Sequence, residues 1–257
     1  MDLARIFARP IAHRGLHDAG RGVIENTRAA ARAAIDRGYA IECDVALSAD
    51  GHPMVFHDDT LDRLTAASGP LAARTRAELE TIEITGGGET IPSLADFLAL
   101  VAGRVALVIE LKSTFGPRPD EALVARVASL LATYPGPVVT KSFDPRLVAA
   151  ANRMMPAIAH GIVADACRDP EWRTMTTALD RFRLRHLLHA GWSRPAFVSW
   201  CVGDFPAPGP WIARRVFGLP VMTWTVRTPA DRRRAALHAD QIVFEGFDPD
   251  REPLSPV

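Results

Sequence analysis

The chain has 257 residues, of which 48% are hydrophobic and 23% are charged, as is usual for a globular protein with a sizeable core. Lys and Arg together number 30, as do Asp and Glu, so the formal net charge is zero. This balance argues against broad electrostatic binding to nucleic acid or to an anionic membrane, because both need a surplus of basic residues.

The cysteines and the N-terminal residues exclude further classes of protein. Cys43, Cys167 and Cys201 are widely spaced and include no C-x-x-C pair, which argues against structural disulfides and a zinc–thiolate site. Residues 1–10 have no long apolar run followed by a small-residue cleavage site. We therefore expect no signal peptide, no membrane insertion and, by default, a cytoplasmic protein.

Short apolar runs rich in β-branched residues alternate with longer Ala- and Arg-rich stretches of helical spacing. The expected strands are Pro10–His13, Ala40–Val45, Arg104–Lys112, Val138–Ser142, Ala157–Val163, Phe197–Val202, Val221–Val226 and Gln241–Phe244. The expected helices are Asn26–Arg37, Ser93–Val101, Asp120–Ala132, Pro145–Met154, Pro170–Leu179, Trp211–Phe217 and Pro229–Ala239. This alternation predicts parallel strands connected by crossover helices.

Eight strands in a chain of this length fit a (β/α)8 TIM barrel, predicted here as a single domain over residues 1–257. The alternative is an open, doubly wound sheet, but such a sheet normally has a Gly-rich phosphate-binding turn after an early strand, and the sequence has none. Residues 48–103 interrupt the alternation with an extra strand at Pro53–His57 and a turn-rich segment. We expect them to form a small insertion after the second strand, near the active-site end of the barrel.

Acidic residues occupy alternate positions of the second expected strand. In Ile41–Val45 the apolar side chains share one face, and Glu42 and Asp44 share the other, because side chains two residues apart on a strand point the same way. The apolar face should meet the surrounding helices, so both carboxylates should point into the barrel. Glu110 and Lys112 repeat the pattern on the third strand. All four side chains should therefore meet near the carboxyl ends of the strands, where barrel enzymes have their active sites.

Burying three carboxylates is unfavourable unless they are paired or bind a cation. With a single lysine beside them, Glu42, Asp44 and Glu110 leave an uncompensated negative charge. A divalent cation that prefers hard oxygen ligands would compensate it. The alternative is a charge network without metal, closed by arginines such as Arg14.

Two histidines accompany the acidic residues. His13 ends the first expected strand, and His57 follows the apolar run Met54–Phe56. A single histidine in either place is more often a packing or surface residue, but two beside the same carboxylates suit acid–base chemistry. Phosphodiester hydrolysis needs a base to activate the nucleophile and an acid to protonate the leaving alkoxide, and histidine titrates in the range for both.

Three further residues are candidates for binding a substrate. Arg14 and Lys112 suit phosphate, since Arg can bond two oxygens at once and Lys acts as a point charge. Trp224 alternates with Met222 and Val226 on the seventh expected strand. It either packs in the core or forms an aromatic wall for a glycerol or alcohol moiety.

Motifs along nearly the whole chain resemble those of the glycerophosphodiester phosphodiesterase family. They are Ile11–Gly15, Glu25–Thr27, Ile41–Val45, Asp50–Gly51, Val55–Asp58, Leu61–Arg63 with Thr65, Ile91–Leu94, Ile109–Lys112 and, more weakly, Ser142–Asp144 and Thr223–Val226. The ordered set of His-Arg, Glu-x-Asp, His-Asp and Glu-x-Lys is much more specific than any one of its members.

The resemblance implies a TIM-barrel enzyme that hydrolyses glycerophosphodiesters to an alcohol and glycerol 3-phosphate with one divalent metal ion, Mg²⁺ or Ca²⁺. Its partner would be a small-molecule substrate and not nucleic acid. The implied site residues are Glu42, Asp44 and Glu110 for the metal, His13 and His57 as the acid–base pair, and Arg14 and Lys112 for the phosphate.

The sequence departs from the family pattern in two places. Ile24 precedes Glu-Asn-Thr where the family often has proline, which should change only the turn. The last strand continues as V-F-E-G-F-D-P over Val243–Pro249, where the family often has Thr-Asp before a proline-containing loop. The second departure bears on the floor of the pocket and on substrate preference.

Three other functions stay open from the sequence. An inward set of Glu, Asp, Glu and Lys could serve a metal-dependent lyase or an enolising enzyme, with Lys112 as base or Schiff-base former. A protein that binds a phosphate ligand without turnover is the non-enzymatic alternative. A lysophospholipase D-like activity on lysolipids is closer to the family, although residues 48–103 lack a long apolar patch, which favours soluble diesters.

Overall fold

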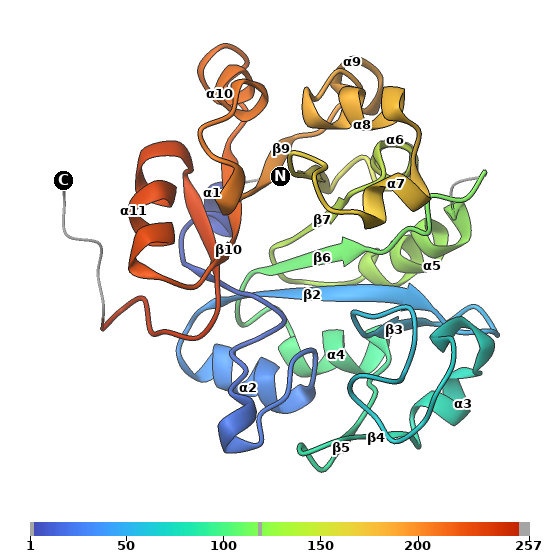
Figure 1. The fold of residues 1–257 in the computed structure, drawn as a ribbon. Helices are drawn as coiled ribbons and strands as arrows, with labels where there is room; N and C mark the ends of the chain where they lie inside the picture. The colour runs from blue at the N-terminus through green and yellow to red at the C-terminus, as the bar shows by residue number, and fades with distance from the viewer. Residues whose placement is uncertain (1–2, 118–119, 252–257) are drawn as a thin grey trace.

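The computed structural model describes residues 3–117 and 120–251, in which eight parallel strands form a closed barrel (Figure 1). The barrel strands are β1 (Ile11–Ala12), β2 (Ala40–Leu47), β6 (Leu107–Leu111), β7 (Val138–Ser142), β8 (Ala159–Ala164), β9 (Phe197–Cys201), β10 (Val221–Val226) and β11 (Gln241–Phe244). Their order is β1-β11-β10-β9-β8-β7-β6-β2, and pairing of β1 with β2 closes the ring. The predicted (β/α)8 TIM barrel is confirmed.

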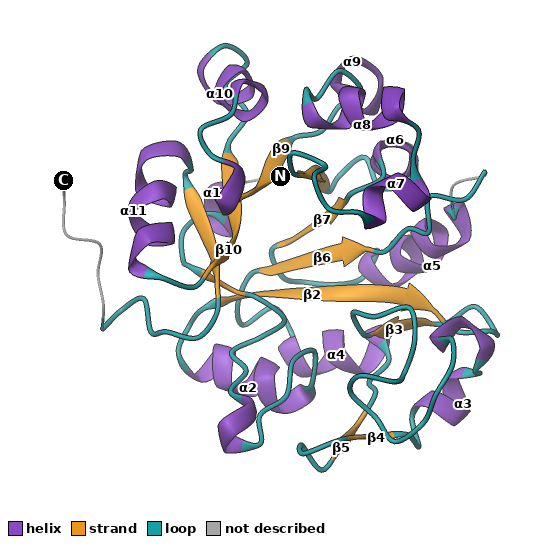
Figure 2. Ribbon diagram, in the orientation of Figure 1, coloured by secondary structure: helices purple, strands orange, loops and turns teal. Residues whose placement is uncertain are grey.

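Most helices lie around the outside of the barrel, whereas α1 packs its Ile6 with the barrel interior (Figure 2). They are α1 (Leu3–Ile6), α2 (Arg28–Asp36), α3 (Arg76–Leu79), α4 (Leu94–Val101), α5 (Glu121–Leu131), α6 (Pro145–Met154), α7 (Glu171–Met175), α8 (Ala178–Arg185), α9 (Ala190–Ser193), α10 (Pro208–Arg215) and α11 (Pro229–His238). Short 3-10 turns are η1 (Ala19–Arg21), η2 (Leu71–Ala73) and η3 (Val202–Asp204). Among the described residues, no helix combines the length and the apolar character that crossing a membrane requires.

The long connection between β2 and β6 carries additional structure at one side of the barrel. The strand β3 (Pro53–Val55) pairs antiparallel with β2, so the expected extra strand is present but ends two residues early. A separate hairpin consists of β4 (Glu83–Ile84) and β5 (Glu89–Thr90). These loops pack on an apolar cluster of their own that includes Met54, Phe56 and Leu61.

One expected helix, Pro170–Leu179, is wrong as a single element. It is divided into α7 and the start of α8, because Thr177 forms a capping box with Asp180. The Thr177 side chain accepts a hydrogen bond from the Asp180 backbone, and the Asp180 carboxylate accepts one from the Thr177 backbone, which starts a new helix. In addition, α10 begins earlier than expected, at Pro208, because proline fits the first turn of a helix.

Side chains along the barrel strands alternate between two apolar clusters. Residues such as Ile41, Ile109 and Val138 pack in one cluster with side chains of α4, α5 and α6. The residues next to them in sequence belong to a second cluster with Ile6 of α1, and this cluster includes Ile11, Ala40, Val108, Val139, Phe197, Met222 and Val243. Since successive strand side chains point to opposite faces, the second cluster fills the barrel interior below the site.

The packed interior predicts a steric cost at one glycine. A Cβ atom added to Gly161 on β8 would lie 2.2 Å from Cε2 of Phe197. We expect Gly161→Ala to lower the free energy of unfolding by about 1–3 kcal/mol, the usual cost of overpacking a core. Urea titration measures this, and Gly191→Ala is the control, because a Cβ there meets no atom within 4 Å. Equal stability of Gly161→Ala and the wild type would contradict a filled interior.

Candidate active site

Three buried carboxylates meet toward the carboxyl ends of β2 and β6. Glu42 and Asp44 lie on β2, and Glu110 on β6 is paired in register with Asp44. The three residues are only 1%, 2% and 6% exposed. One ligand oxygen from each lies within 4.8 Å of the others. The parallel register therefore brings together the acidic residues that alternation along the strands had placed on the inner face.

A lysine that sequence reasoning did not assign to the site contacts this acidic cluster. Lys141 on β7 is 3% exposed, and its Nζ lies 2.9 Å from Glu42 Oε1 and 3.2 Å from Glu110 Oε2. Burial lowers the pKa of Lys141, but the charges of Glu42 and Glu110 outweigh burial and raise it above its ordinary value. The ammonium is therefore charged. Lys141 is two residues after Val139 on β7, so the two side chains lie on the same face of the strand. Val139 packs in the barrel interior, and this alternation could have indicated that Lys141 points inward.

Two further cations lie beside the cluster. Lys112 Nζ lies 3.5 Å from Glu110 Oε1 and 3.7 Å from Asp44 Oδ1. Arg14 Nε lies 3.5 Å from Asp44 Oδ2, but its guanidinium is shared with Glu25. The expectation of an uncompensated negative charge counted Lys112 alone and missed Lys141, which compensates part of that charge.

The turn after β1 places Arg14 between two acidic groups. The Arg14 backbone N–H donates to Glu42 Oε2 at 3.1 Å, and its Nη1 donates to Glu25 Oε1 at 2.6 Å. The following Gly15 has a φ of +80°, and a Cβ there would lie 2.8 Å from the Cβ of Ala30. Glycine is thus required for this turn, both for its backbone conformation and for its contact with α2.

Each residue of the segment Glu25–Thr27 has its own structural role. Glu25 binds Arg14, as described above. Asn26 Nδ2 donates to Asp44 Oδ2 at 3.0 Å, and Asn26 Oδ1 accepts from the Asp44 backbone at 3.2 Å. Thr27 caps α2 by accepting from the Ala30 backbone. The Glu-Asn-Thr motif therefore fixes both the orientation of Asp44 and the start of the helix.

His13 is oriented by a carboxylate that follows the last strand. Its Nδ1 lies 2.8 Å from Glu245 Oε2, and Arg227 Nε donates to Glu245 Oε1 at 2.6 Å. His17 Nε2 also lies 3.7 Å from Glu245 Oε2. Burial raises the pKa of Glu245, but the hydrogen bonds from His13, His17 and Arg227 outweigh burial and lower it far below its ordinary value. The departure from Thr-Asp at this position thus retains an ionised carboxylate.

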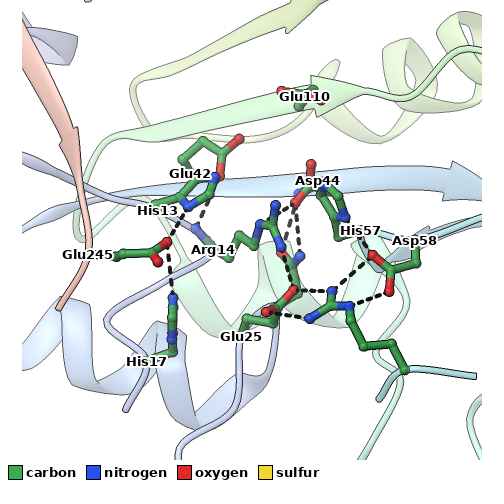
Figure 3. Close-up of polar contacts among 12 residues, drawn as sticks. His13, Arg14, His17, Glu25, Glu42, Asp44, His57, Asp58, Glu110 and Glu245 are labelled. Carbon is green, nitrogen blue, oxygen red and sulfur yellow. Dashed lines mark hydrogen bonds and ion pairs between the residues drawn. The ribbon is translucent and has the colours of Figure 1, made fainter. Parts of the chain in front are cut away.

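His57 is oriented in the same manner by its neighbour. His57 Nδ1 lies 2.6 Å from Asp58 Oδ1. Arg63 donates from Nε to Asp58 Oδ2 at 2.6 Å and from Nη2 to Glu25 Oε1 at 2.8 Å. Through Glu25, this network continues to Arg14 (Figure 3). The charged groups around His57 and those around the acidic cluster therefore form one connected set.

Both histidines keep one ring nitrogen for chemistry. An ionised carboxylate can only accept hydrogen bonds, so Nδ1 of each ring is the donor and Nε2 is left for another partner. Figure 3 shows His13 and His57 on opposite sides of Arg14, with Glu42 near His13 and Asp44 near His57. This arrangement can supply one proton donor and one proton acceptor to a group bound at the cluster.

Trp224 lies at one end of a row of aromatic side chains. Its Nε1 donates to the Ser199 carbonyl at 3.1 Å, and its ring centre is 5.4 Å from that of Phe143. The row continues from Phe143 to Trp172 at 5.7 Å and from Trp172 to Phe115 at 5.5 Å. Trp224 is partly exposed and packs against the interior cluster, so it combines a packing role with an accessible aromatic surface.

The donor set fits a hard divalent cation. Two oxygens that share one Ca²⁺ lie at most about 5 Å apart, so oxygens within 4.8 Å of one another can bind the same ion. Among the described residues, Glu42 Oε1 is a buried oxygen that accepts no hydrogen bond of acceptable geometry, although Lys141 Nζ is close. Three carboxylates without a thiolate or imidazole ligand are typical of Mg²⁺ or Ca²⁺ sites.

Residues 13–245 match the model of the Glycerophosphoryl diester phosphodiesterase family. The chain belongs to this family. A glycerophosphodiester phosphodiesterase of Caldanaerobacter subterraneus subsp. tengcongensis is 33% identical over 163 residues, or 60% of this chain. The chain spans 65% of that relative's length. The resemblance inferred from the motifs is therefore confirmed at the level of the family.

Solved structures of phosphodiesterases share the fold. A phosphodiesterase of Oleispira antarctica, solved with the product sn-glycerol-3-phosphate, has a TM-score of 0.74 at 24% identity, and the match covers 92% of both chains. A glycerophosphodiester phosphodiesterase of Agrobacterium tumefaciens has a TM-score of 0.68 at 27% identity, covering 92% of this chain and 95% of that chain. Both proteins have the same overall barrel as this chain.

The network around Arg63 predicts how stability depends on pH. Burial raises the pKa of Glu25 and of Asp58, but the hydrogen bonds from Arg63 and its neighbours outweigh burial and lower both to about 2. The ordinary values are 4.5 and 3.8, so this stabilisation is present above about pH 4.5 and is lost as the pH falls to about 2. We expect Arg63→Gln to move the acid-unfolding midpoint to higher pH, as measured by circular dichroism. Arg32→Gln, which removes an exposed ion pair with Glu89, is the control, and an unchanged midpoint in Arg63→Gln would contradict the network.

Proposed function

We propose that this protein is a metal-dependent phosphodiesterase that hydrolyses glycerophosphodiesters to an alcohol and glycerol 3-phosphate. The observation that carries the proposal is a buried acidic cluster flanked by two histidines, each with a carboxylate on Nδ1. The cluster lies toward the carboxyl ends of the barrel strands, where enzymes with this fold have their active sites. Membership of the family supports the same reaction.

Glu42, Asp44 and Glu110 would hold one divalent cation, Mg²⁺ or Ca²⁺. When bound, such a cation withdraws charge from the phosphoryl oxygens and makes phosphorus easier to attack. Asn26 supports this role by fixing Asp44 through two hydrogen bonds. Lys141 supports it because its ammonium contacts both Glu42 and Glu110 and so keeps the two carboxylates close together.

Lys112 and Arg14 would bind the phosphodiester. The Lys112 ammonium is at least 3.5 Å from its carboxylate partners, so it is held loosely enough to approach a phosphoryl oxygen. The Arg14 guanidinium is anchored by Glu25 and faces the acidic cluster. Both cations would stabilise the charge that develops on the phosphoryl oxygens. Trp224 would line the pocket for the glycerol or the leaving alcohol.

His13 and His57 would transfer the protons. One imidazole removes a proton from the attacking oxygen, which is either water or the neighbouring glycerol hydroxyl of the substrate. Attack by the hydroxyl would first give a cyclic phosphodiester of glycerol, which a water molecule, activated in the same way, then opens to glycerol 3-phosphate. As the bond from phosphorus to the leaving oxygen breaks, the other imidazole protonates that oxygen and the alcohol departs. Glu245 and Asp58 act through the histidines, because each fixes the tautomer and ring orientation of its partner.

The lyase alternative is less compatible with the site. A Lys112 that acts as a base or forms a Schiff base must be able to lose its proton. Burial lowers the pKa of Lys112, but the charges of Glu110 and Asp44 outweigh burial and raise it above its ordinary value. The carboxylates beside Lys112 thus favour its charged form, which suits binding of a phosphate better than covalent catalysis by this lysine.

The reaction predicts a defined product and a defined metal response. We expect release of glycerol 3-phosphate from glycerophosphocholine, glycerophosphoethanolamine or glycerophosphoglycerol, measured with a coupled dehydrogenase assay. Activity should disappear in EDTA and return with Mg²⁺ or Ca²⁺, since the three carboxylates would bind either ion. A lysophosphatidylcholine arm tests the lysophospholipase D alternative. Full turnover in EDTA would refute metal dependence, and binding without turnover in every arm would favour the phosphate-binding alternative.

The acid–base assignment predicts large and similar effects at both histidines. His13→Ala and His57→Ala should each lower kcat by about 10²–10⁴, the usual contribution of a general acid or base. His52→Ala is the matched control, because this side chain is half exposed beside the β2–β3 turn and lies outside the cluster. Full turnover by either active-site variant would remove that histidine from the mechanism.

Lys141 predicts a link between metal binding and stability. Lys141→Met leaves Glu42 and Glu110 without their shared counter-charge, so we expect a loss of about 3–5 kcal/mol in unfolding free energy in EDTA. Added Ca²⁺ should stabilise Lys141→Met more than the wild type, because the ion replaces the missing positive charge. Lys112→Met, whose ammonium lies farther from the carboxylates, should lose less. A Ca²⁺-induced shift no larger than that of the wild type would indicate that the ion is not held by Glu42 and Glu110.

A further inference from the structure

Large apolar side chains lie exposed on α8, α9 and α10 and in the turns that follow α8 and α10. We call this surface the α8–α10 face and define it by Phe182, Leu188, Trp192, Trp211, Val216 and Phe217. These side chains are 54% to 71% exposed, whereas the barrel interior is fully closed to solvent. A group of exposed tryptophan, phenylalanine and aliphatic side chains on the outside of a barrel marks an interaction surface.

The helices of this face are neighbours in space. Gly209 in the first turn of α10 packs against the end of α8, where an added Cβ would lie 3.3 Å from the Arg185 carbonyl oxygen and 3.5 Å from Leu187. Figure 1 shows α8, α9 and α10 along one edge of the molecule, opposite α2 and α3. The helices that carry these exposed apolar residues therefore lie on one side of the protein, and α11 beside them adds the exposed Leu237.

The same face has a local surplus of positive charge, although the whole chain is neutral. Residues 178–194 contain four arginines and one aspartate, and residues 208–217 contain two arginines and no acidic residue. Arg183, Arg185, Arg194 and Arg215 are exposed. In the part of the chain that the structure describes, no carboxylate oxygen lies within 4.0 Å of any of these four guanidinium groups. Their charge is thus available to a partner.

We propose that the α8–α10 face docks the protein on an anionic phospholipid surface. Tryptophan and phenylalanine rings are favoured at the boundary between acyl chains and headgroups, and nearby arginines pair with lipid phosphates. Arginine can also bury its aliphatic stem while its guanidinium stays at the polar boundary. The combination of exposed rings and unpaired arginines fits this partner, and the binding is peripheral, since it uses side chains on the surface of short helices.

A second copy of the chain is the competing occupant of this face. In a two-fold symmetric dimer the same patch meets itself, which would bring an arginine-rich surface of one copy against the same arginine-rich surface of the other. Like charges across an interface disfavour association. An anionic surface has the complementary charge, so the arginines favour membrane docking over self-association.

Vesicle co-sedimentation at low ionic strength tests the proposal with the whole chain. We expect the wild type to sediment with phosphatidylglycerol vesicles and to stay in solution with phosphatidylcholine vesicles. Trp192→Ser with Trp211→Ser removes the rings, and Arg183→Gln with Arg215→Gln removes two charges. Each arginine should contribute about fivefold to affinity. The arginine double variant should therefore bind roughly 25-fold more weakly than the wild type. These side chains are exposed, so circular dichroism should show unchanged folding.

The control variant is Arg32→Gln with Arg74→Gln, which removes the same charge from α2 and from the residue before the cap of α3, and both helices lie on the opposite edge. Retained binding by this control, with loss in the two α8–α10 variants, supports the proposal. A wild type that does not bind phosphatidylglycerol vesicles, or an equal loss in the control, would overturn it. Light scattering that shows a dimer dissociated by Trp192→Ser with Trp211→Ser would assign the face to a second copy and also overturn it. Binding is measured without substrate, so this result is independent of the proposed hydrolysis.

Discussion

Holding three carboxylates inside a barrel is the constraint on which the rest of the site depends. An ion removed from water is stable only where opposite charge and hydrogen-bond donors reach it. Lys141 meets this need for Glu42 and Glu110, and its burial lies between theirs. Asp44, the third carboxylate, is held by Asn26 and faces Arg14 and Lys112. The cluster is therefore organised before any substrate arrives, and its geometry is maintained by the strands themselves.

Barrel closure is what joins residues that are far apart in the sequence. Pairing of β1 with both β2 and β11 places the residue after β1, His13, between Glu42 on one side and Glu245 on the other. His13 and Glu245 are 232 positions apart in the sequence, but they are neighbours in space because β1 pairs with β11. The same closure lets Arg14 reach Glu42 through its backbone and Glu25 through its side chain. Positioning of both histidines by carboxylates follows from the fold as much as from the motifs.

The sequence alone was sufficient for the parts of this structure that depend on short-range patterns. Alternation within Ile41–Val45 predicts inward carboxylates because the relevant neighbours are two residues apart, and the eight strand positions follow from equally local runs. Alternation on β7 could place Lys141 inside the barrel, but its contact with Glu110 needed the register of β7 with β6, which no local pattern encodes. Glu245 needed the closure of the barrel. The division between α7 and α8 depends on one side-chain cap at Thr177, which competes with continued helical spacing.

The central claim is that the three carboxylates bind one cation together. Anomalous diffraction from crystals soaked in Mn²⁺, which binds the oxygen-rich sites of Mg²⁺ and Ca²⁺, tests this directly. We expect one strong anomalous peak within about 2.0–2.6 Å of an oxygen from each of Glu42, Asp44 and Glu110. A saturating soak that leaves the cluster without a peak, with Lys141 still bonded to Glu42 and Glu110, would contradict the account.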